Sequence, residues 1–461
     1  MDSKRDRLLA GLGAALCSGL LSFFGTGFTP VPALTWLAPL PVLLLAPRVP
    51  ARWAAAAAFL AGVLGSANNW AHSLHSNDVP LPMALGISAG MAVTLTAVVL
   101  LFRALVLRGL PLLATVAAPA VWTGALYLAS VANPTGVMGT PANSMGDVPV
   151  VLQIASVTGF WGIEFVLLLV PAGIAAMVGS TVPRWRIGAA LAVVLVGVLG
   201  FGIIRLAGEP GPSHQVALIA PNQGHWAVDV ATADGERLVR AYADRIAALP
   251  EGVRLVVLPE GEFGVDDASL PSLVTPLTNA ARDRGADVVV GYVRRSGDAK
   301  LNTALAIPAD GAAPAAYVRG QARELVYAAG AGVQICGEVN LAHPSRDYAA
   351  AGARTMAIPA ADEKANGWQH ARVASLRGVE NGFGVAWSGR TGVLMVSDGM
   401  GRIVAEARTG GADTFTTVVA GLPAGPGATP YTRLGDWFAW LCLVIAVSSV
   451  IVAVRRQRAG G

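Results

Sequence analysis

Long apolar runs dominate this sequence and restrict the folds open to it. A helix needs about 20 residues to cross a bilayer, and eight runs are long enough to span or nearly span one. They cover residues 8–25, 31–47, 53–70, 83–102, 110–131, 157–180, 187–204 and 436–454. Only 13% of the 461 residues are charged, against about 25% in an average soluble protein. The sequence therefore predicts a polytopic membrane protein with about eight transmembrane helices.

Connections that contain basic residues alternate with connections that contain none. Lys and Arg gather in "MDSKRDR" and at 47–52, 103–108, 183–186 and 455–458, whereas the connections in between hold neither. Because basic loops are retained in the cytoplasm, we expect both termini inside it and residues 205–435 outside. The same distribution accounts for the net charge of +4. We therefore expect a membrane as partner and no nucleic acid.

The large outer segment has a different pattern. Short β-branched runs, typical of buried strands, alternate with amphipathic helical stretches. The expected strands are 214–220, 254–259, 286–293, 301–308, 332–336, 354–359, 383–388, 392–397 and 414–422, and the helices 231–249, 272–285 and 368–382. This mixture predicts an α/β or layered α+β domain. The expected domains are 1–207 for seven membrane helices, 208–430 for the extracytoplasmic domain, and 431–461 for the last helix and a basic cytoplasmic tail.

Two of the expected strands end at residues with catalytic chemistry. Glu260 follows "RLVVLP", and Cys336 closes "GVQIC". Side chains converge on a ligand crevice at strand ends in α/β sheets, and a carboxylate can take the proton of an attacking thiol. A structural cysteine and a glutamate paired with an arginine are the alternative. Spacing typical of a zinc site is absent, and we expect no metal and no cofactor.

Several motifs together resemble a known family. "VVLPEGEF", "GVQICGE" and "WQHARVASLRGVENGFGVAWSGRTGVLMVSDGMGRIVAEA" are similar to the nitrilase, or carbon-nitrogen hydrolase, superfamily. With the surrounding helices, and with "NQGHW", "GFWGIEFV" and "TPYTRLGDWFAWL", the chain resembles the bacterial apolipoprotein N-acyltransferase family. The resemblance implies an α-helical membrane bundle plus an extracytoplasmic nitrilase-like α-β-β-α sandwich, in the bacterial cytoplasmic membrane.

The resemblance also implies an activity and residue roles. Members move an acyl chain from a phospholipid, through a cysteine thioester, to the α-amino group of the N-terminal cysteine of a diacylated lipoprotein. They use a Glu-Lys-Cys triad. Glu260 matches the general base, Cys336 the nucleophile, and Glu338 a supporting glutamate after the cysteine.

The lysine of the triad has no counterpart here. The three lysines are Lys4, Lys300 and Lys364, and the lysine position of the family motif falls on Arg319 or, in a shifted register, on Ala322. A second active-site glutamate and a long lid segment of the family are also missing between Arg319 and Cys336. Arginine keeps the positive charge but does not give up its proton. Two alternatives follow: a divergent enzyme with altered amide or ester chemistry, and an inactive paralogue that binds lipid or lipoprotein.

Glu164 is an ionisable residue within an expected membrane helix. Such residues are rare and often functional, which makes Glu164 a candidate. The alternative is an interfacial glutamate that reaches lipid headgroups or an arginine of the outer domain.

Overall fold

The computed structural model describes the chain except for residues 1–3, 77–78, 180–182, 298, 322–323 and 460–461. It divides into two compact units. One comprises Met1–Arg205 together with Leu434–Gly461, and the other comprises Leu206–Arg433.

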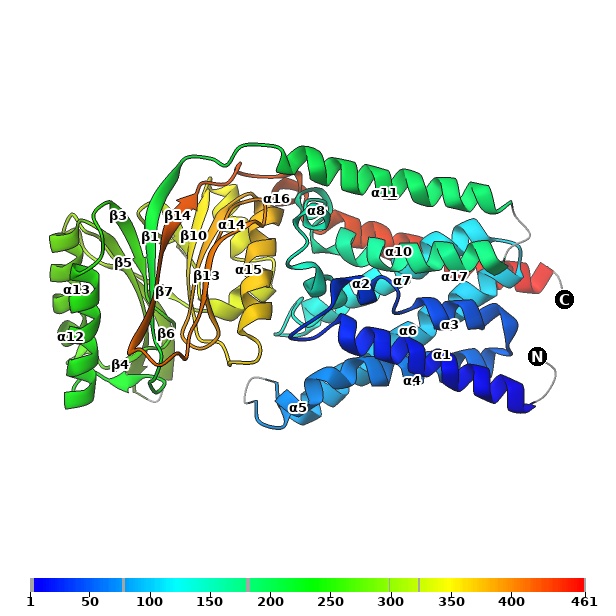
Figure 1. The fold of residues 1–461 in the computed structure, drawn as a ribbon, viewed down its shortest axis with the longest axis horizontal. Helices are drawn as coiled ribbons and strands as arrows, with labels where there is room; N and C mark the ends of the chain where they lie inside the picture. Colours follow the sequence, from blue (N-terminus) through cyan, green and yellow to red (C-terminus); the bar gives the residue numbers. More distant parts are fainter. Residues whose placement is uncertain (1–3, 77–78, 180–182, 298, 322–323, 460–461) are drawn as a thin grey trace. The chain divides into compact units, whose positions relative to one another are not determined.

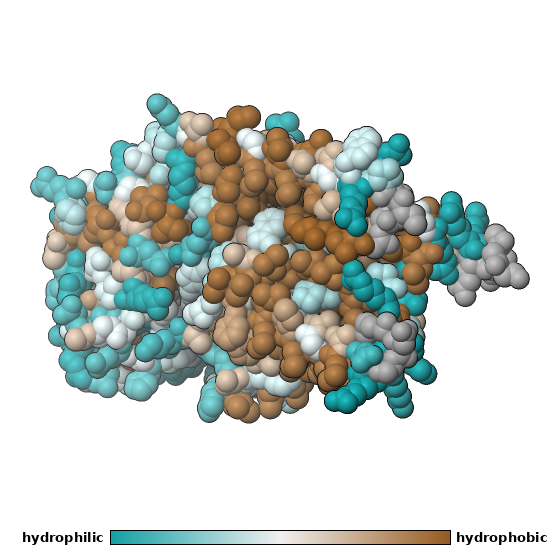
Figure 2. All heavy atoms as spheres, turned by 45° about the vertical axis from the view of Figure 1, so that its right-hand side comes forward, coloured by the Kyte–Doolittle hydropathy of each residue, from teal (hydrophilic) through white to brown (hydrophobic). Residues whose placement is uncertain are grey.

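The first unit is a bundle of apolar helices (Figure 1). Among the described residues, six helices are long and apolar enough to cross a membrane. They are α1 (Lys4–Gly25), α6 (Leu81–Leu107), α7 (Pro111–Ala132), α10 (Phe160–Gly179), α11 (Arg184–Leu206) and α17 (Trp437–Ala459). Their outward faces are apolar: Val193, Val196 and Ile204 on α11 are 72%, 72% and 75% exposed. Figure 2 shows how densely such side chains cover this unit, as expected for a surface that faces lipid.

The two remaining apolar runs form shorter helices. Residues 31–47 are divided between α2 (Pro32–Thr35), α3 (Leu40–Leu45) and the 3-10 helix η1 (Ala46–Arg48), because prolines within the run remove backbone donors and interrupt a helix. The run at 53–70 forms α4 (Ala51–Ser66), of 16 residues. A membrane bundle is thus confirmed, while the count of eight spans stays a prediction. The other short helices are η2 (Ala67–Asn69), α5 (Trp70–Ser73), η3 (Pro141–Met145), α8 (Pro149–Leu152) and α9 (Ala155–Thr158).

The second unit contains two sheets. The eight-stranded sheet has the order β14-β1-β3-β5-β4-β2, with β6 paired to β5 and β7 to β6. Its strands are β1 (Ser213–Pro221), β2 (Val228–Asp229), β3 (Val253–Val257), β4 (Phe263–Val265), β5 (Asp287–Ser296), β6 (Ala299–Ile307), β7 (Ala315–Val318) and β14 (Phe415–Pro423). The six-stranded sheet has the order β13-β12-β11-β10-β9-β8. Its strands are β8 (Tyr327–Ala328), β9 (Ala331–Val333), β10 (Thr355–Ala360), β11 (Gly384–Gly389), β12 (Val393–Ser397) and β13 (Ile403–Arg408).

Helices cover the outer faces of both sheets (Figure 1). On the eight-stranded sheet, α12 (Ala233–Ala247) and α13 (Leu270–Arg284) bury one apolar side each in a core that includes Tyr242 and Leu277. On the six-stranded sheet lie α14 (Ser345–Ala350) and α15 (Gly367–Asn381), and α16 (Pro430–Leu434) follows β14. The expected α-β-β-α sandwich is confirmed. Strands β1, β3 and β5 are parallel, as are β9, β10 and β11.

The expected strands are found with small shifts in their ends, apart from one that matters for the site. The run at 332–336 forms a strand only over Ala331–Val333, and Cys336 instead begins the 3-10 helix η4 (Cys336–Asn340). The sequence pattern did not predict five of the strands: β2, β4, β7, β8 and β13. Several of these are very short, and a short strand shows too little alternation of apolar and polar residues to be recognised.

Gly291 in β5 lets the loop after β3 lie directly against this strand. Its amide donates to the carbonyl oxygen of Pro259 at 3.1 Å, and its own carbonyl accepts from the amide of Glu262 at 3.1 Å. A Cβ atom at Gly291 would lie 2.3 Å from the Pro259 oxygen and 2.5 Å from Cα of Glu260. Backbone atoms cannot give way as a flexible side chain can, so a side chain here must displace Glu260.

The substitution Gly291→Ala should therefore damage both the fold and the position of Glu260. We expect a loss of about 1–3 kcal/mol of stability, typical of overpacking, and an altered rate of Cys336 alkylation in the protein that remains folded, because Glu260 is the expected base for that thiol. Thermal unfolding in detergent and the alkylation rate measure the two effects. Gly411→Ala is the control, because a Cβ atom at Gly411 would lie 3.6 Å from Nδ2 of Asn222, an ordinary van der Waals contact. Equal behaviour of the two variants would contradict this account of Gly291.

Candidate active site

Glu260 lies three residues beyond the end of β3 and is buried. Its amide donates to the carbonyl oxygen of Ala360 at the end of β10, at 3.2 Å, which fixes it between the two sheets. Its Oε1 atom accepts hydrogen bonds from Nη1 of Arg319 at 3.0 Å and from Nδ2 of Asn302 at 2.6 Å. The carboxylate is thus held by one cation and one amide.

Cys336 directly follows Ile335 at the start of η4, and its thiol forms a hydrogen bond with the Glu260 carboxylate. The backbone amide of Ala361 donates to its sulfur. Its φ of +38° lies in the left-handed region, where residues other than glycine are uncommon. Such strain is often found where a reactive side chain must be held in one direction. The structure thus brings together the two residues that the sequence singled out as base and nucleophile.

Burial sets the proton affinities of this pair. It raises the pKa of the Cys336 thiol well above its ordinary value, and the nearby carboxylates of Glu260 and Asp362 raise it further. Burial also raises the pKa of Glu260, which the charge of Arg319 partly offsets. The resting thiol therefore keeps its proton, and Glu260 is a stronger base than an exposed carboxylate. This combination requires a proton transfer during attack.

Arg319 immediately follows β7, and its guanidinium reaches this pair. Its amide donates to the carbonyl oxygen of Asn302 at 2.9 Å, which holds the β7 end against β6. A Cβ atom at Gly337 would lie 2.8 Å from its Nη2 atom, so the glycine after the nucleophile leaves room for the cation. Ala322, the other candidate for the lysine position, lies outside the described residues. The three lysines, Lys4, Lys300 and Lys364, are all exposed.

Glu338 joins the turn of the nucleophile to the segment of Arg319. Its Oε2 atom accepts from the Tyr317 hydroxyl and from the Ile335 amide, both at 2.9 Å. Its Oε1 atom accepts from the Gly320 amide at 2.9 Å. Because these donors flank Arg319 on one side and Cys336 on the other, Glu338 positions both. This geometry agrees with a supporting role.

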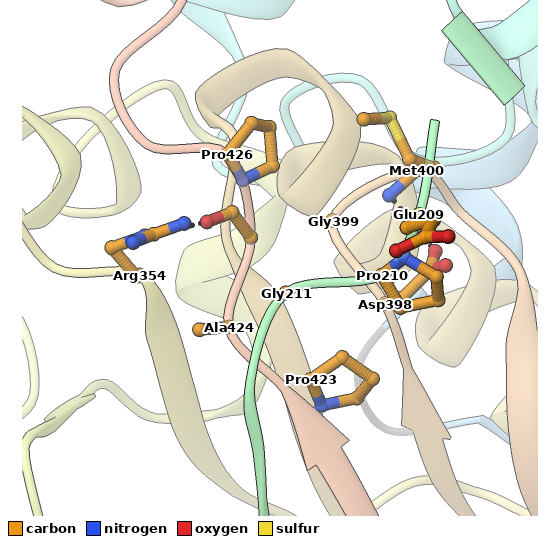
Figure 3. A pocket seen from close by; sticks show the side chains of 11 residues that line it. Glu209, Pro210, Gly211, Arg354, Asp398, Gly399, Met400, Pro423, Ala424 and Pro426 are labelled. Carbon is orange, nitrogen blue, oxygen red and sulfur yellow. Dashed lines mark hydrogen bonds between the residues drawn. The ribbon is translucent and has the colours of Figure 1, made fainter. Parts of the chain in front are cut away.

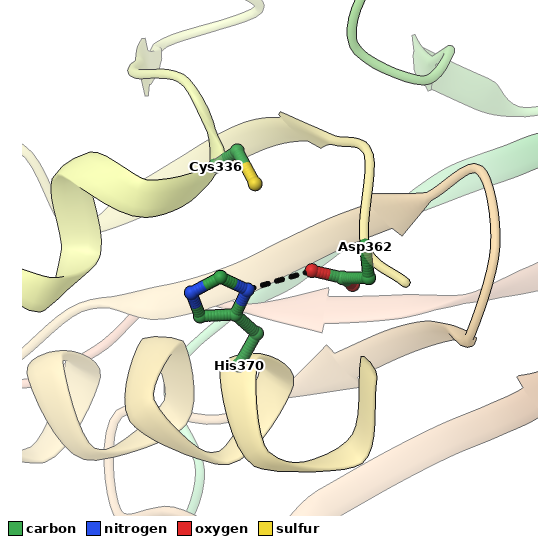
Figure 4. Close-up of side chains that lie close together, drawn as sticks. All are labelled: Cys336, Asp362 and His370. Atoms are coloured by element: carbon green, nitrogen blue, oxygen red, sulfur yellow. Dashed lines mark hydrogen bonds and ion pairs between the residues drawn. The ribbon is translucent and has the colours of Figure 1, made fainter. Parts of the chain in front are cut away.

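Two further polar residues near Cys336 were missed by sequence reasoning. Asp362 follows β10 by two residues, and His370 lies on α15; both are buried. His370 Nδ1 lies 2.8 Å from Asp362 Oδ1 (Figure 4). One aspartate in a loop and one histidine on the following helix form no recognisable sequence motif. Only their position beside the thiol in the structure identifies them.

Glu164 belongs to the helical unit. It is fully buried in the second turn of α10. Its Oε2 atom accepts from Trp122 Nε1 at 3.1 Å, and its Oε1 atom from the Ala142 amide at 2.8 Å. It therefore ties α7 and η3 to α10. Of the two interpretations of Glu164, the interfacial glutamate that reaches lipid headgroups does not fit these contacts, because both carboxylate oxygens accept hydrogen bonds inside the bundle.

A small pocket elsewhere in the second unit, of about 100 Å³, holds no catalytic candidate (Figure 3). It is lined by residues such as Glu209, Arg354 and Asp398. Arg354 is engaged there through Nε, which donates to the Gly425 carbonyl oxygen at 2.6 Å. None of the residues around Cys336 described above lines this pocket.

Comparison with known proteins gives matches along nearly the whole chain. Residues 18–173 match the family model of the apolipoprotein N-acyltransferase N-terminal domain, and residues 215–423 that of carbon-nitrogen hydrolase. An apolipoprotein N-acyltransferase of Geobacter metallireducens is 26% identical over 523 aligned positions, which cover 98% of this chain and 96% of the relative.

Solved structures also resemble part of the chain. Nit3 of Saccharomyces cerevisiae, a member of the nitrilase superfamily, is 21% identical, with a TM-score of 0.39, over 46% of this chain and 91% of its own. The CN-hydrolase superfamily protein XC1258 of Xanthomonas campestris is 18% identical, with a TM-score of 0.36, over 45% of this chain and 91% of its own.

The substitution Glu338→Ala should leave the Tyr317 hydroxyl and the amides of Gly320 and Ile335 without their acceptor. Each buried donor left unsatisfied costs about 1–3 kcal/mol, so we expect a lower unfolding temperature and faster alkylation of Cys336 as its turn loosens. Glu338→Gln keeps two acceptor lone pairs and should lie between wild type and alanine. Unchanged alkylation in Glu338→Ala would show that Glu338 does not position Cys336.

Proposed function

Because this chain belongs to the apolipoprotein N-acyltransferase family, within the nitrilase superfamily, we propose that Cys336 transfers an acyl chain from a phospholipid to a lipoprotein. The acceptor is the α-amino group of the N-terminal cysteine of a diacylated lipoprotein. One observation carries the proposal: the buried Cys336 thiol is hydrogen-bonded to Glu260, whose carboxylate is paired with Arg319.

In the first half-reaction Glu260 acts as general base. It takes the thiol proton while Cys336 Sγ attacks the ester carbonyl carbon of the phospholipid. The ester C–O bond breaks, the proton passes from Glu260 to the departing alkoxide, and a thioester remains on Cys336. Splitting acyl transfer into two steps through a covalent intermediate is the advantage of a nucleophilic cysteine.

In the second half-reaction the same carboxylate serves the amine. The α-amino group attacks the thioester carbon, and Glu260 takes the proton that the new amide nitrogen loses. The C–S bond breaks, and the proton returns from Glu260 to Cys336. The enzyme is then in its starting state, with one amide formed and one ester broken.

Arg319 supplies the positive charge that the family places on a lysine. Its charge favours the ionised forms of both Glu260 and Cys336, and a cation at this distance also favours the negative oxygen of the tetrahedral intermediate. A guanidinium does not give up its proton. We therefore propose that Arg319 stabilises negative charge in the site and that Glu260 carries out the proton transfer.

The membrane unit supports the choice of substrates. Six helices within the described residues are apolar enough to span a bilayer, which fits a protein held in the membrane, where both lipid-bearing substrates are confined. From the alternation of basic loops we propose that both termini lie in the cytoplasm and that residues 208–430 lie on the outer side of the bacterial cytoplasmic membrane. The contact of the buried Cys336 thiol with the Glu260 carboxylate, which can take its proton, supports an active enzyme over an inactive paralogue.

The activity can be tested in a bacterium depleted of its own apolipoprotein N-acyltransferase. We expect the wild-type chain to give lipoproteins with an N-acylated terminal cysteine, as measured by mass spectrometry, and Cys336→Ala and Glu260→Gln to give none. Lys364→Ala is the matched control, since this lysine is exposed in a loop. Diacylated lipoproteins alone in all strains, with the proteins present in the membrane, would reject the proposal.

The role of Arg319 can be tested through the pH dependence of acyl transfer. Arg319 lowers the pKa of Glu260, and the reaction needs the ionised carboxylate. Removing the charge in Arg319→Gln raises that pKa, so the rising limb of the rate profile should move to higher pH. Losing one such stabilising group should also lower the plateau by roughly 10²–10³. Arg319→Lys should keep the limb near its original place; a limb that does not move in Arg319→Gln argues against the electrostatic role.

A further inference from the structure

Three buried side chains with metal-binding atoms meet beside the nucleophile. Cys336 Sγ, a carboxylate oxygen of Asp362 and a ring nitrogen of His370 all lie within 4.8 Å of one another. They come from three separate segments, namely η4, the loop after β10, and α15. Figure 4 shows the thiol and the carboxylate on the same side of the imidazole. Acyl transfer through Cys336 and Glu260 makes no use of Asp362 or His370.

Hydrogen bonds fix the two added residues from outside the cluster. Asp362 Oδ2 accepts from Trp387 Nε1 at 3.2 Å, while its Oδ1 atom lies 2.8 Å from His370 Nδ1. The other ring nitrogen, His370 Nε2, lies 3.0 Å from the side-chain nitrogen of Asn340. Both imidazole nitrogens thus have partners, so His370 is poorly placed to take the thiol proton. A histidine oriented by an outer hydrogen bond on one nitrogen is, however, the usual arrangement at a metal site.

We propose that Cys336, Asp362 and His370 form an inhibitory site for a thiophilic divalent cation such as Zn²⁺. Zinc favours sulfur, nitrogen and carboxylate ligands in a tetrahedral arrangement, with bonds of about 2.0–2.3 Å. Three donor atoms within 4.8 Å reach such a centre with small shifts, and water fills the fourth position. The cation class follows from the thiol and the imidazole, because Mg²⁺ and Ca²⁺ prefer oxygen ligands.

Binding releases one proton, from the thiol, and shifts a second proton within the imidazole from Nδ1 to Nε2. The thiol proton leaves to solvent, and the thiolate binds the metal. The neutral imidazole binds through Nδ1 and carries its proton on Nε2, where the Asn340 amide turns its oxygen to accept it. Asp362 exchanges its hydrogen bond to Nδ1 for a metal bond and keeps the one from Trp387. While the metal is bound, the Cys336 thiolate is not available to attack the ester. The metal is therefore a reversible inhibitor of the proposed acyl transfer.

Zinc protection of Cys336 tests the proposal without any lipid substrate. The full-length protein carries Cys17→Ala and Cys442→Ala, so that Cys336 is its only thiol, and its alkylation by iodoacetamide is followed with ZnCl₂ or MgCl₂. At ten times the dissociation constant, Zn²⁺ should slow alkylation about tenfold, and Mg²⁺ should not. Co²⁺ should give a thiolate-to-cobalt charge-transfer band that Cys336→Ser lacks. No protection and no band would overturn the site, whatever the fate of the acyltransferase proposal.

Variants identify the other two ligands. His370→Ala and Asp362→Asn should each raise the Zn²⁺ concentration needed for protection by more than roughly 100-fold. Losing only a residue that hydrogen-bonds to a metal ligand costs roughly 10–100-fold in metal affinity. His343→Ala is the matched control, because His343 and Asp347 form an exposed pair at 2.8 Å that includes no thiol. If His370→Ala fails to fold, Trp387→Phe removes only the outer donor to Asp362 and should weaken protection about 10–100-fold. Protection that is unchanged in these variants would contradict the assignment.

Discussion

The charge balance around one buried carboxylate sets what this site can do. Glu260 is excluded from water, and a lone charge there is costly. Arg319 and Asn302 offset that cost through hydrogen bonds to the same oxygen atom. The pKa of Glu260 is still raised, which leaves a base strong enough to accept a proton from a thiol that burial keeps protonated. Without the cation the pKa of Glu260 would rise further, and a larger share of the carboxyl groups would already hold a proton and be unable to accept the one from the thiol.

The fold maintains this balance by bringing together the loop after β3, the residue that follows β7 and the start of η4. Gly291 admits the Glu260 loop against β5, and Gly337 makes room for Arg319 beside the nucleophile. Glu338 then joins the two segments that flank Arg319 and Cys336. Within the part of the chain that the structure describes, the guanidinium of Arg319 thus supplies the one positive charge bonded to Glu260, in a site that lacks the lysine, the second glutamate and the lid expected from the family motif.

The sequence predicted the parts of this molecule that depend on local pattern. Apolar length predicted the membrane bundle, and β-branched runs predicted the strands that precede Glu260 and Cys336. Local pattern did not show which atoms of distant segments meet: the family motif pointed to Arg319, but its hydrogen bond to Glu260, 59 positions away, is seen only in the structure. Asp362 and His370 had no motif of their own. The end of β9 at Val333 was also missed, because the run continues with Ile335 and Cys336 although the backbone has already turned.

The central claim is that Cys336 carries the acyl chain. Intact-protein mass spectrometry after incubation with a phospholipid of one acyl-chain length, without any lipoprotein acceptor, tests it most directly. The account predicts a mass increase equal to that acyl group, located on Cys336 by peptide mapping and released by hydroxylamine as a thioester should be. A folded protein that gains no acyl group, or gains it at another residue, would contradict the account.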